Sequence, residues 1–543
     1  IYMRDWSSDV CSSDLPAPEP PLPATRSLLT AHRLPYAILA LETGLRALDL
    51  AVILTYFAVT VGIGLWAARR QHSVGDYFLG ARNLPAWGVM LSIVATETSA
   101  LTVISVPGIA ARGNLTFLQL PLGYCLGRIA VAAWLLPGYF RGEQETAYVR
   151  LERRFGPGVR RLVSSVFLVT RFLGEGVRLF AGALPLALMT GWSVPTSILI
   201  MGGITLVYTW FGGLTAVVWA DALQLVVYLA GGLAALVLAS QLSGGVPAML
   251  ANAAEAGKLQ VFDFSFSFTR PYVLLGGLIG GGLLSAASHG TDHLIVQRLL
   301  ATRSLRDAQA ALIGSGVLVV VQFGLFLLVG IALWSAGLAP EGVPSDTIFP
   351  RFIVEHLPPG LAGLVIAGIL AAALGSSVSA MASSTTHDLY ASWTGRRDPA
   401  HLLRVGRVVS AAWGFGIMGA ALGFYAAAAT SDTPAVVLAL SIASVTYGAL
   451  LGTYVLASRW ARAEGRDVVL ATIVTVTFML CVIFAARLSA SAAFAWLAPV
   501  ARLAWPWYVP LGTTLCIATG VLASLFHAPA QTATASAGSE MAD

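Results

Sequence analysis

The sequence predicts an all-α polytopic membrane protein with about thirteen transmembrane helices. Hydrophobic residues make up 57% of the 543 residues, whereas charged residues make up only 11%. Soluble domains carry about a quarter charged residues, so a soluble chain of this size would lack the charge to cover its surface. The chain also contains thirteen apolar runs, each long enough to cross about 30 Å of hydrocarbon. We therefore expect the chain to fold in lipid.

The apolar runs define the expected spans in chain order, with short polar loops between them. Together they predict a transmembrane domain over residues 46–530. The runs lie near residues 48–68, 86–112, 116–140, 160–190, 193–211, 214–240, 271–289, 307–337, 358–388, 403–427, 433–458, 467–488 and 505–527.

The two ends of the chain have other compositions. Residues 1–15 lack the apolar core of a signal peptide and are expected to be a non-native appendage. Residues 16–45 are rich in proline and predict a disordered tail. Residues 531–543 are expected to form a short cytoplasmic tail.

The distribution of basic residues predicts the orientation in the membrane. If the first loop is inside, the inside loops carry nineteen arginines and the outside loops six basic residues. Cytoplasmic loops are the ones enriched in Lys and Arg, so the N-terminus is expected outside and the C-terminus in the cytoplasm. The inside set is Arg69, Arg70, Arg82, Arg141, Arg150, Arg153, Arg154, Arg160, Arg161, Arg298, Arg303, Arg306, Arg396, Arg397, Arg404, Arg407, Arg459, Arg462 and Arg466, and the outside set is Arg112, Lys258, Arg270, Arg351, Arg487 and Arg502.

Acidic side chains within the apolar runs mark candidate functional positions. Glu97, Glu175 and Asp221 lie deep inside runs, and a charge in lipid costs several kcal/mol unless it faces a cavity or a partner. Arg171, Glu175 and Arg178 share one helix face and can neutralise one another, which leaves a structural role open for Glu175. Glu97 and Asp221 have no such neighbours in the sequence, and this favours a role in transport.

Two of the runs look internally broken. In 86–112 the polar stretch 96–99 interrupts the apolar pattern, and in 271–289 five glycines precede Ser285 and Ser288. Interrupted helices at corresponding positions of two halves indicate an inverted-repeat secondary transporter with its sites at the midplane. The alternative for the glycines is close packing of helices.

The run at 358–388 offers oxygen ligands. Ala373, Ser376 and Ser377 share one helix face, and sodium, like other hard cations, prefers oxygen. Serines in membrane helices also bond back to the preceding turn. The spacing alone therefore does not decide whether an ion binds here.

Other functional classes find little support. The four cysteines show no CxxC spacing, so neither a disulfide framework nor a zinc site is indicated. No P-loop, HExxH or GxSxG pattern and no midplane nucleophile–base pair occurs, so an enzyme is not expected. Arginines in short loops do not indicate a nucleic-acid partner, and no obligatory protein partner is implied.

Four stretches resemble the sodium/solute symporters, a family that includes the sodium/proline, sodium/glucose, multivitamin and sialic acid transporters. The resemblance runs from about residue 48 to residue 460, and the stretches occur in the family's order. They are DYFLGARNLPAWGVMLSIVATETSALTVISVPG (76–108), YTWFGGLTAVVWADALQ (208–224), GTDHLIVQRLLATRSLRDAQAAL (290–312) and LPPGLAGLVIAGILAAALGSS (357–377).

This resemblance implies a core of ten helices in two inverted five-helix repeats of the leucine-transporter type, over about 86–240 and 271–458. One helix would precede the core and two would follow it. The resemblance also implies sodium-driven uptake of a small organic solute by alternating access.

The same resemblance implies the ligands, position by position. Sodium would meet the carbonyls of Ala95, Thr98 and Ala373 and the hydroxyls of Ser376 and Ser377. Asp221 falls where some members place an acid that assists or binds a second sodium. The solute contacts would include Glu97, Ser99 and Thr102.

The chain departs from the family pattern at three places. Ser288 and Ser285 stand where sodium/sugar members carry an aromatic gate and an amide, which argues against a sugar. Asp388 follows Ser377 about three residues sooner than the family pattern predicts, so Ser379 and Ser383 remain rival ligands.

The third departure is Glu97, which stands where members recognising anions carry a neutral residue. A midplane carboxylate needs a cation, which would be sodium, an inward Arg171 or Arg178, or a positive group on the solute. We therefore expect a solute with an amine or many hydroxyl donors.

Together these features predict a sodium-coupled symporter of a small polar solute in the inner (plasma) membrane of a bacterial-type cell. Two alternatives remain open. One is a proton-coupled symporter of the same fold, with Glu97 or Asp221 as the proton carrier. The other is a membrane-embedded solute sensor, although the short C-terminal tail is expected to hold no signalling domain.

Overall fold

Helices make up nearly all of the described chain because its apolar runs must satisfy their backbone hydrogen bonds internally in lipid. The structure, a computed structural model, describes residues 47–69, 73–98, 100–141, 144–343, 345–373, 377–428, 435–489 and 492–527. Within these ranges the one departure from helices and loops is an isolated bridge between Leu84 and Thr302. The two tails expected at 1–45 and 531–543 lie outside the described residues.

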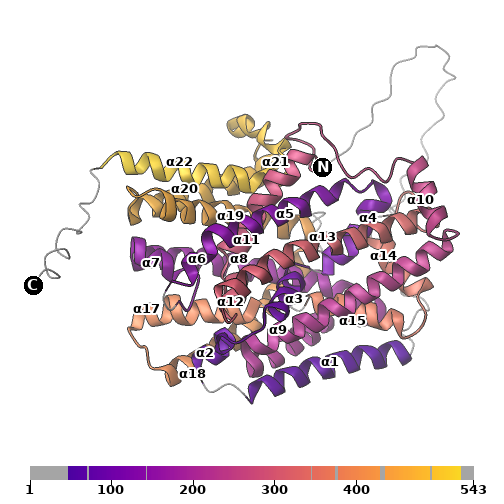
Figure 1. The fold of residues 1–543 in the computed structure, drawn as a ribbon, viewed down its shortest axis with the longest axis horizontal. Helices are drawn as coiled ribbons and strands as arrows, with labels where there is room; N and C mark the ends of the chain where they lie inside the picture. The colour runs from indigo at the N-terminus through magenta and orange to yellow at the C-terminus, as the bar shows by residue number, and fades with distance from the viewer. Residues whose placement is uncertain are drawn as a thin grey trace, which may run out of the picture. The chain divides into compact units, whose positions relative to one another are not determined.

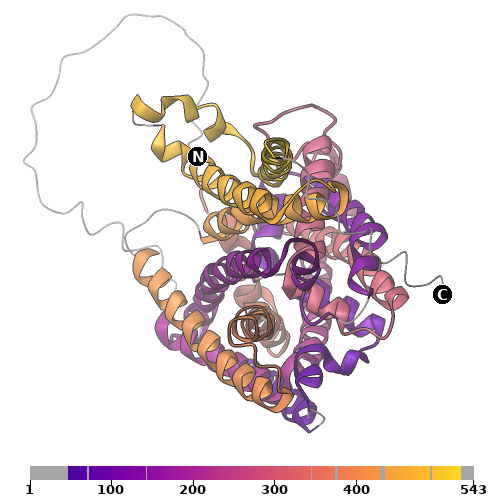
Figure 2. The same ribbon diagram turned by 90° about the vertical axis from the view of Figure 1, so that its left-hand side faces the viewer.

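The described helices run side by side along one main direction, as Figure 1 shows, and Figure 2 looks along several of them after a quarter turn. Three π-helical turns lie among them, at Val131–Leu135, Gly276–Gly280 and Thr385–Tyr390. The helices are α1 (Ala47–Ala68), α2 (Val74–Leu79), α3 (Ala86–Glu97), α4 (Ala100–Arg112), α5 (Gln119–Ala130), α6 (Leu136–Tyr139), α7 (Val149–Phe155), α8 (Pro157–Thr190), α9 (Val194–Leu242), α10 (Val246–Glu255), α11 (Gly281–Gly290), α12 (His293–Leu300), α13 (Leu305–Ser335), α14 (Ser345–His356), α15 (Leu361–Ala373), α16 (Ser377–Ser384), α17 (Ala391–Thr394), α18 (Pro399–Ala428), α19 (Ala435–Arg459), α20 (Gly465–Ile483), α21 (Ala485–Leu488) and α22 (Tyr508–Leu525).

Seven of the described helical segments are long and apolar enough to cross a membrane, and the bent pair α3–α4 qualifies as an eighth. The protein is therefore a multi-pass membrane protein, as its composition predicts. The number of thirteen spans stays a prediction. The expected spans 193–211 and 214–240 both fall in α9, which kinks at Gly213 with φ 50° and ψ −151°, a conformation that glycine tolerates.

The break expected in the first broken run is confirmed. Helix α3 ends at Glu97 because Thr98 takes extended backbone angles, φ −79° and ψ 108°. Helix α4 then continues at an angle of 64° to α3. The end of α3 is a point where a helix leaves carbonyls without intrahelical partners.

The second broken run differs from the expectation. The glycines of 271–289 lie in a π turn and in α11, and the helix is interrupted only after them, at Thr291 and Asp292. There Asp292 takes extended angles and caps α12 by accepting a hydrogen bond from the Leu294 N–H at 2.9 Å. The glycines instead allow close packing of helices, which was the alternative to a break. A Cβ at Gly281 would lie 2.7 Å from the Leu120 carbonyl oxygen of α5.

Two arginines that the orientation count assigned to loops are in fact buried. Arg298 of α12 is wholly buried. Arg160 of α8 donates through Nε to Asp388 at 2.6 Å and contacts Glu152. Asp388 also accepts a hydrogen bond from Thr146 at 2.5 Å. The contacts of Arg160 join α8 to α7 and to the π turn at Thr385–Tyr390, so Arg160 has a structural use besides any role in topology.

We expect Gly281→Ala to destabilise the protein, because the added methyl group meets backbone that cannot move aside. Overpacking of this kind costs about 1–3 kcal/mol. The matched control is Gly324→Ala on α13, where an added Cβ meets nothing within 4 Å. Thermal unfolding in detergent should show a lower midpoint for Gly281→Ala alone, and equal midpoints for the two variants would contradict the packing role.

Candidate solute and sodium sites

The interrupted helix α3 carries Glu97, whose carboxylate faces a buried arginine. Arg128 of α5 forms an ion pair with Glu97. The Arg128 side chain is completely buried, whereas Glu97 is 20% exposed. Arg128 also donates to the hydroxyls of Ser315, at 2.8 Å, and Ser285, at 3.4 Å. The pair thus joins α3, α5, α11 and α13 at the break.

Arg128 is a residue that the sequence analysis missed, and it corrects the interpretation of Glu97. We expected sodium, Arg171, Arg178 or a positive solute group to neutralise this acid. Arg128 already does so, so an amine on the solute is not required by the charge of Glu97. The signal was present, since Arg128 lies in the middle of the apolar run 116–140, where a lone charge demands a partner.

Ser285 and Ser288, the two serines predicted for the solute site, both lie on α11 near this pair. Ser285 contacts Arg128 as described above. The Ser288 hydroxyl lies 2.8 Å from Nδ1 of His289, and Nε2 of His289 lies 3.8 Å from the Glu97 carboxylate. His289 therefore joins the cluster, although no pattern in the sequence singled it out.

The remaining predicted solute contacts are placed differently. Thr102 lies on α4, just after the break, and Ser99 lies outside the described residues. Arg171 and Arg178 lie on α8 and flank Glu175, with nitrogen–oxygen distances of 3.7 and 3.6 Å. The local neutralisation considered for Glu175 is therefore confirmed.

The candidate sodium ligands lie at two helix ends. Ala95 and Thr98 belong to the end of α3, Ala373 is the last residue of α15, and Ser377 is the first residue of α16. Ser376 lies outside the described residues. The Ser377 hydroxyl donates a hydrogen bond to Glu175 Oε1 at 2.7 Å, which leaves the lone pairs of its oxygen available to a cation.

The two rival serines face another helix. Ser379 accepts a hydrogen bond from Gln297 at 3.5 Å, and Ser383 lies 3.1 Å from Nε2 of His293. Both contacts are with α12 and not with α8. Among the described serines of α16, Ser377 is thus the one engaged with the acid of α8.

Asp221 lies beside the first core helix but has partners already. Its carboxylate accepts hydrogen bonds from Ser92, at 2.7 Å, and Thr96, at 3.3 Å, and pairs with Arg298 at 3.1 Å. Both members of the ion pair are buried. The sequence indicated no local arginine for Asp221, and the partner comes from α12, far along the chain.

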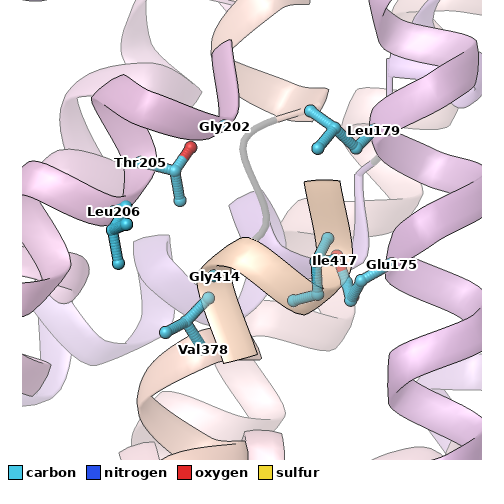
Figure 3. Close-up of a pocket in the computed structure, with 8 residues that line it drawn as sticks. All are labelled: Glu175, Leu179, Gly202, Thr205, Leu206, Val378, Gly414 and Ile417. Carbon is cyan, nitrogen blue, oxygen red and sulfur yellow. The ribbon is translucent and has the colours of Figure 1, made fainter. Parts of the chain in front are cut away.

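A small cavity of about 20 Å³ adjoins Glu175, lined by α8, α9, α16 and α18. Figure 3 shows Glu175 and Ile417 at one side of this cavity and Thr205 at the other. Its volume suits a single water molecule. Apart from Glu175 and Thr205 its lining is apolar.

Interrupted helices that bring polar groups to the middle of a lipid-solvated bundle are typical of secondary transporters with inverted repeats. The family model of the sodium:solute symporter family matches residues 77–475. The chain belongs to this family, as the resemblance predicts.

Two similar proteins of known function support the assignment. The sodium/iodide cotransporter of Homo sapiens is 33% identical over 375 residues, which cover 64% of this chain and 57% of that protein. The sodium/sialic acid symporter of Aliivibrio fischeri is 28% identical over 374 residues, covering 67% of this chain and 74% of that protein. The matched region thus spans less than two thirds of the length of the sodium/iodide cotransporter and about three quarters of the length of the sodium/sialic acid symporter.

Solved structures agree on the fold. A Na⁺-coupled sialic acid symporter in a substrate-bound outward-open state superposes with a TM-score of 0.78 and 25% identity, covering 90% of this chain and 99% of that one. This neighbour carries the inverted-repeat fold expected for the chain. The family and the structural neighbours are transporters, which points away from an enzyme.

We expect Asp221→Asn to destabilise the fold, because it leaves the buried Arg298 without a counter-charge. Removing one partner of a buried ion pair costs about 3–5 kcal/mol. The double variant Asp221→Asn, Arg298→Gln should recover part of that loss. Chemical or thermal unfolding measures both, and a single variant as stable as wild type would show that the pair has no structural role.

Proposed function

We propose that this protein takes up a small polar organic solute in symport with sodium. The observation that carries the proposal is the meeting of two helix ends through α8. Arg178 donates to the Thr96 carbonyl at the end of α3, and Glu175, its neighbour, accepts from Ser377 at the start of α16. Oxygen groups from both helix ends therefore approach one region, as a coupling ion requires.

The proposed sodium ligands are the carbonyls of Ala95, Thr98 and Ala373 and the hydroxyls of Ser376 and Ser377. These are neutral oxygens, which suit a small hard cation. The last carbonyls of a helix have no intrahelical donor, so binding an ion there does not cost a helical hydrogen bond. Asp221 would add cation affinity only by exchanging its contact with Arg298 for one with sodium.

The proposed solute site is the cluster of Glu97, Arg128, Ser285 and His289, with Ser288, Ser99 and Thr102 as further contacts. The ion pair presents an acceptor and a donor side by side, so a solute with hydroxyl, amide or carboxylate groups can bond to both. The relatives named above carry iodide and sialic acid, and these define probes for a first substrate screen. Arg171 and Arg178, which bond to Asp292 and to the Thr96 carbonyl, would support this cluster from α8.

We propose the plasma membrane as the site of action, with the N-terminus outside and the C-terminus in the cytoplasm. The loop arginines support this orientation, although Arg160 and Arg298 are occupied by buried acids. The repeats would span about 86–240 and 271–458 within a transmembrane domain of residues 46–530. The lipid bilayer and the solute are the partners that this function needs.

The proposal is tested by uptake of radiolabelled sialic acid, iodide, glucose and a monocarboxylate into proteoliposomes. An inward sodium gradient should drive accumulation of one of the organic probes or of a related organic solute, and potassium or choline in its place should not. Accumulation of iodide alone would contradict an organic solute. Uptake driven by a proton gradient in sodium-free buffer would instead establish the proton-coupled alternative.

We expect Ser377→Ala to weaken sodium binding, because one of about five oxygen ligands is lost. A hydrogen-bond-like contact to a charged group is worth about 1.5–3 kcal/mol, so the sodium activation constant should rise at least roughly tenfold. The double variant Ser376→Ala, Ser377→Ala should lose more. The control is Ser379→Ala, which faces α12. If the double variant keeps wild-type sodium activation, the assigned ligands are wrong.

We expect Glu97→Gln to alter solute affinity while leaving sodium affinity nearly unchanged. The substitution removes one acceptor charge and leaves Arg128 with its full positive charge. A neutral or cationic solute should bind more weakly, by about tenfold for one charged hydrogen bond. Uptake measured over a range of solute and sodium concentrations separates the two constants. Tighter binding of a carboxylate by this variant would show that Arg128 anchors an anionic solute.

A further inference from the structure

One short stretch of α8 contacts three helix ends that are far apart in the sequence. Its side chains Arg171, Glu175 and Arg178, here called the α8 triad, occupy successive turns of one face. Arg178 bonds to the end of α3 and Glu175 bonds to the start of α16. Arg171 bonds to Asp292, which caps the start of α12.

The contact at α12 has the most hydrogen bonds of the three. Nε of Arg171 donates to Asp292 Oδ2 at 3.0 Å, and its Nη2 donates to the Tyr447 hydroxyl at 2.8 Å. The Tyr447 hydroxyl itself donates to Asp292 at 3.1 Å. The Asp292 side chain is only 1% exposed. A closed ring of three groups thus fixes α12 and α19 to α8.

The contact of Glu175 with its two arginines is looser. Its Oε1 lies 3.7 Å from Arg171 and 3.6 Å from Arg178, beyond the roughly 2.7–2.9 Å of a close charge-assisted hydrogen bond. The same oxygen accepts the Ser377 hydrogen bond at 2.7 Å. Among the described residues, the carboxylate is therefore shared between two guanidinium groups and held closely by the proposed sodium ligand alone.

We propose that the α8 triad is the positioning element that transmits sodium occupancy at Ser377 to the start of α12 and to Tyr447 in the middle of α19. This rests on the proposed sodium site. A cation bound at Ser377 competes with both arginines for the Glu175 carboxylate, because in the buried core charges act at low effective dielectric. A shift of Glu175 towards sodium leaves Arg171 more strongly held by Asp292 and Tyr447.

The consequence is a thermodynamic linkage between sodium binding and the arrangement of α12 and α19. Sodium stabilises one arrangement of α12 and α19, and the solute that needs this arrangement then binds more tightly. Thermodynamic linkage makes the effect reciprocal, with typical factors of about 5–150. Glu175 is a positioning residue in this scheme, since it acts through Ser377 and Arg171 and not by touching the solute.

The test uses sodium alone as the probe and compares hydrogen–deuterium exchange in saturating sodium chloride and in choline chloride. In the wild-type protein sodium should slow exchange at the start of α16, at α12 and around Tyr447 of α19, by about fivefold or more. In Glu175→Gln, which keeps an oxygen acceptor for Ser377 but removes the charge, the protection at α16 should remain. Protection at α12 and α19 should be lost.

Asp467→Asn is the matched control. Asp467 is a buried acid of α20 that bonds to His527 at 3.0 Å, away from the triad, so this variant should respond to sodium as wild type does. If the Gln variant does not fold, Tyr447→Phe replaces it, because it removes only the hydroxyl that joins Arg171 and Asp292. Sodium should then protect α16 and no longer protect α19.

The outcomes separate the inference from the proposed function. A wild-type protein that shows no sodium-dependent protection anywhere would overturn the sodium site itself. If sodium protects α12 and α19 in Glu175→Gln as strongly as in the wild-type protein, transmission through the triad is overturned. Loss of protection at α16 as well, at saturating sodium, would make Glu175 a direct ligand and would also overturn the positioning role.

Discussion

A charged side chain in a lipid-solvated bundle must meet an opposite charge or a helix end, because isolated burial costs several kcal/mol. This constraint arranges the centre of the protein. Arg128 meets Glu97, Arg298 meets Asp221, and Arg171 meets Asp292. Each of these pairs joins helices from distant parts of the chain, so the pairing that neutralises the charges also decides which helices lie together.

The interruptions of the helices depend on the same constraint. A helix that ends in mid-membrane exposes carbonyl or N–H groups that need partners. Arg178 supplies a donor to the end of α3, and Asp292 supplies an acceptor at the start of α12. A transporter gains two features at once from such ends, a polar site for an ion or solute and a joint where the core is able to bend.

The small residues set how closely these helices approach. The glycines of α5, of the π turn at Gly276–Gly280 and of α11 let backbone meet backbone, and close approach brings Arg128 of α5 within reach of Ser285. The packing of these helices therefore also sets the geometry of the site. A single added methyl group at Gly281 would disturb both.

Composition and local pattern were enough to determine the membrane fold, the break after Glu97 and the mutual neutralisation of Arg171, Glu175 and Arg178. The break and the neutralisation depend on residues within a few turns of one helix, and the membrane fold depends on the composition and apolar runs of the whole chain. The partners of Glu97 and Asp221 were decided only by the tertiary structure, because they come from other helices. The same holds for the glycine run, whose local pattern suits a break and a packing face equally well and whose use is fixed by the neighbouring backbone of α5.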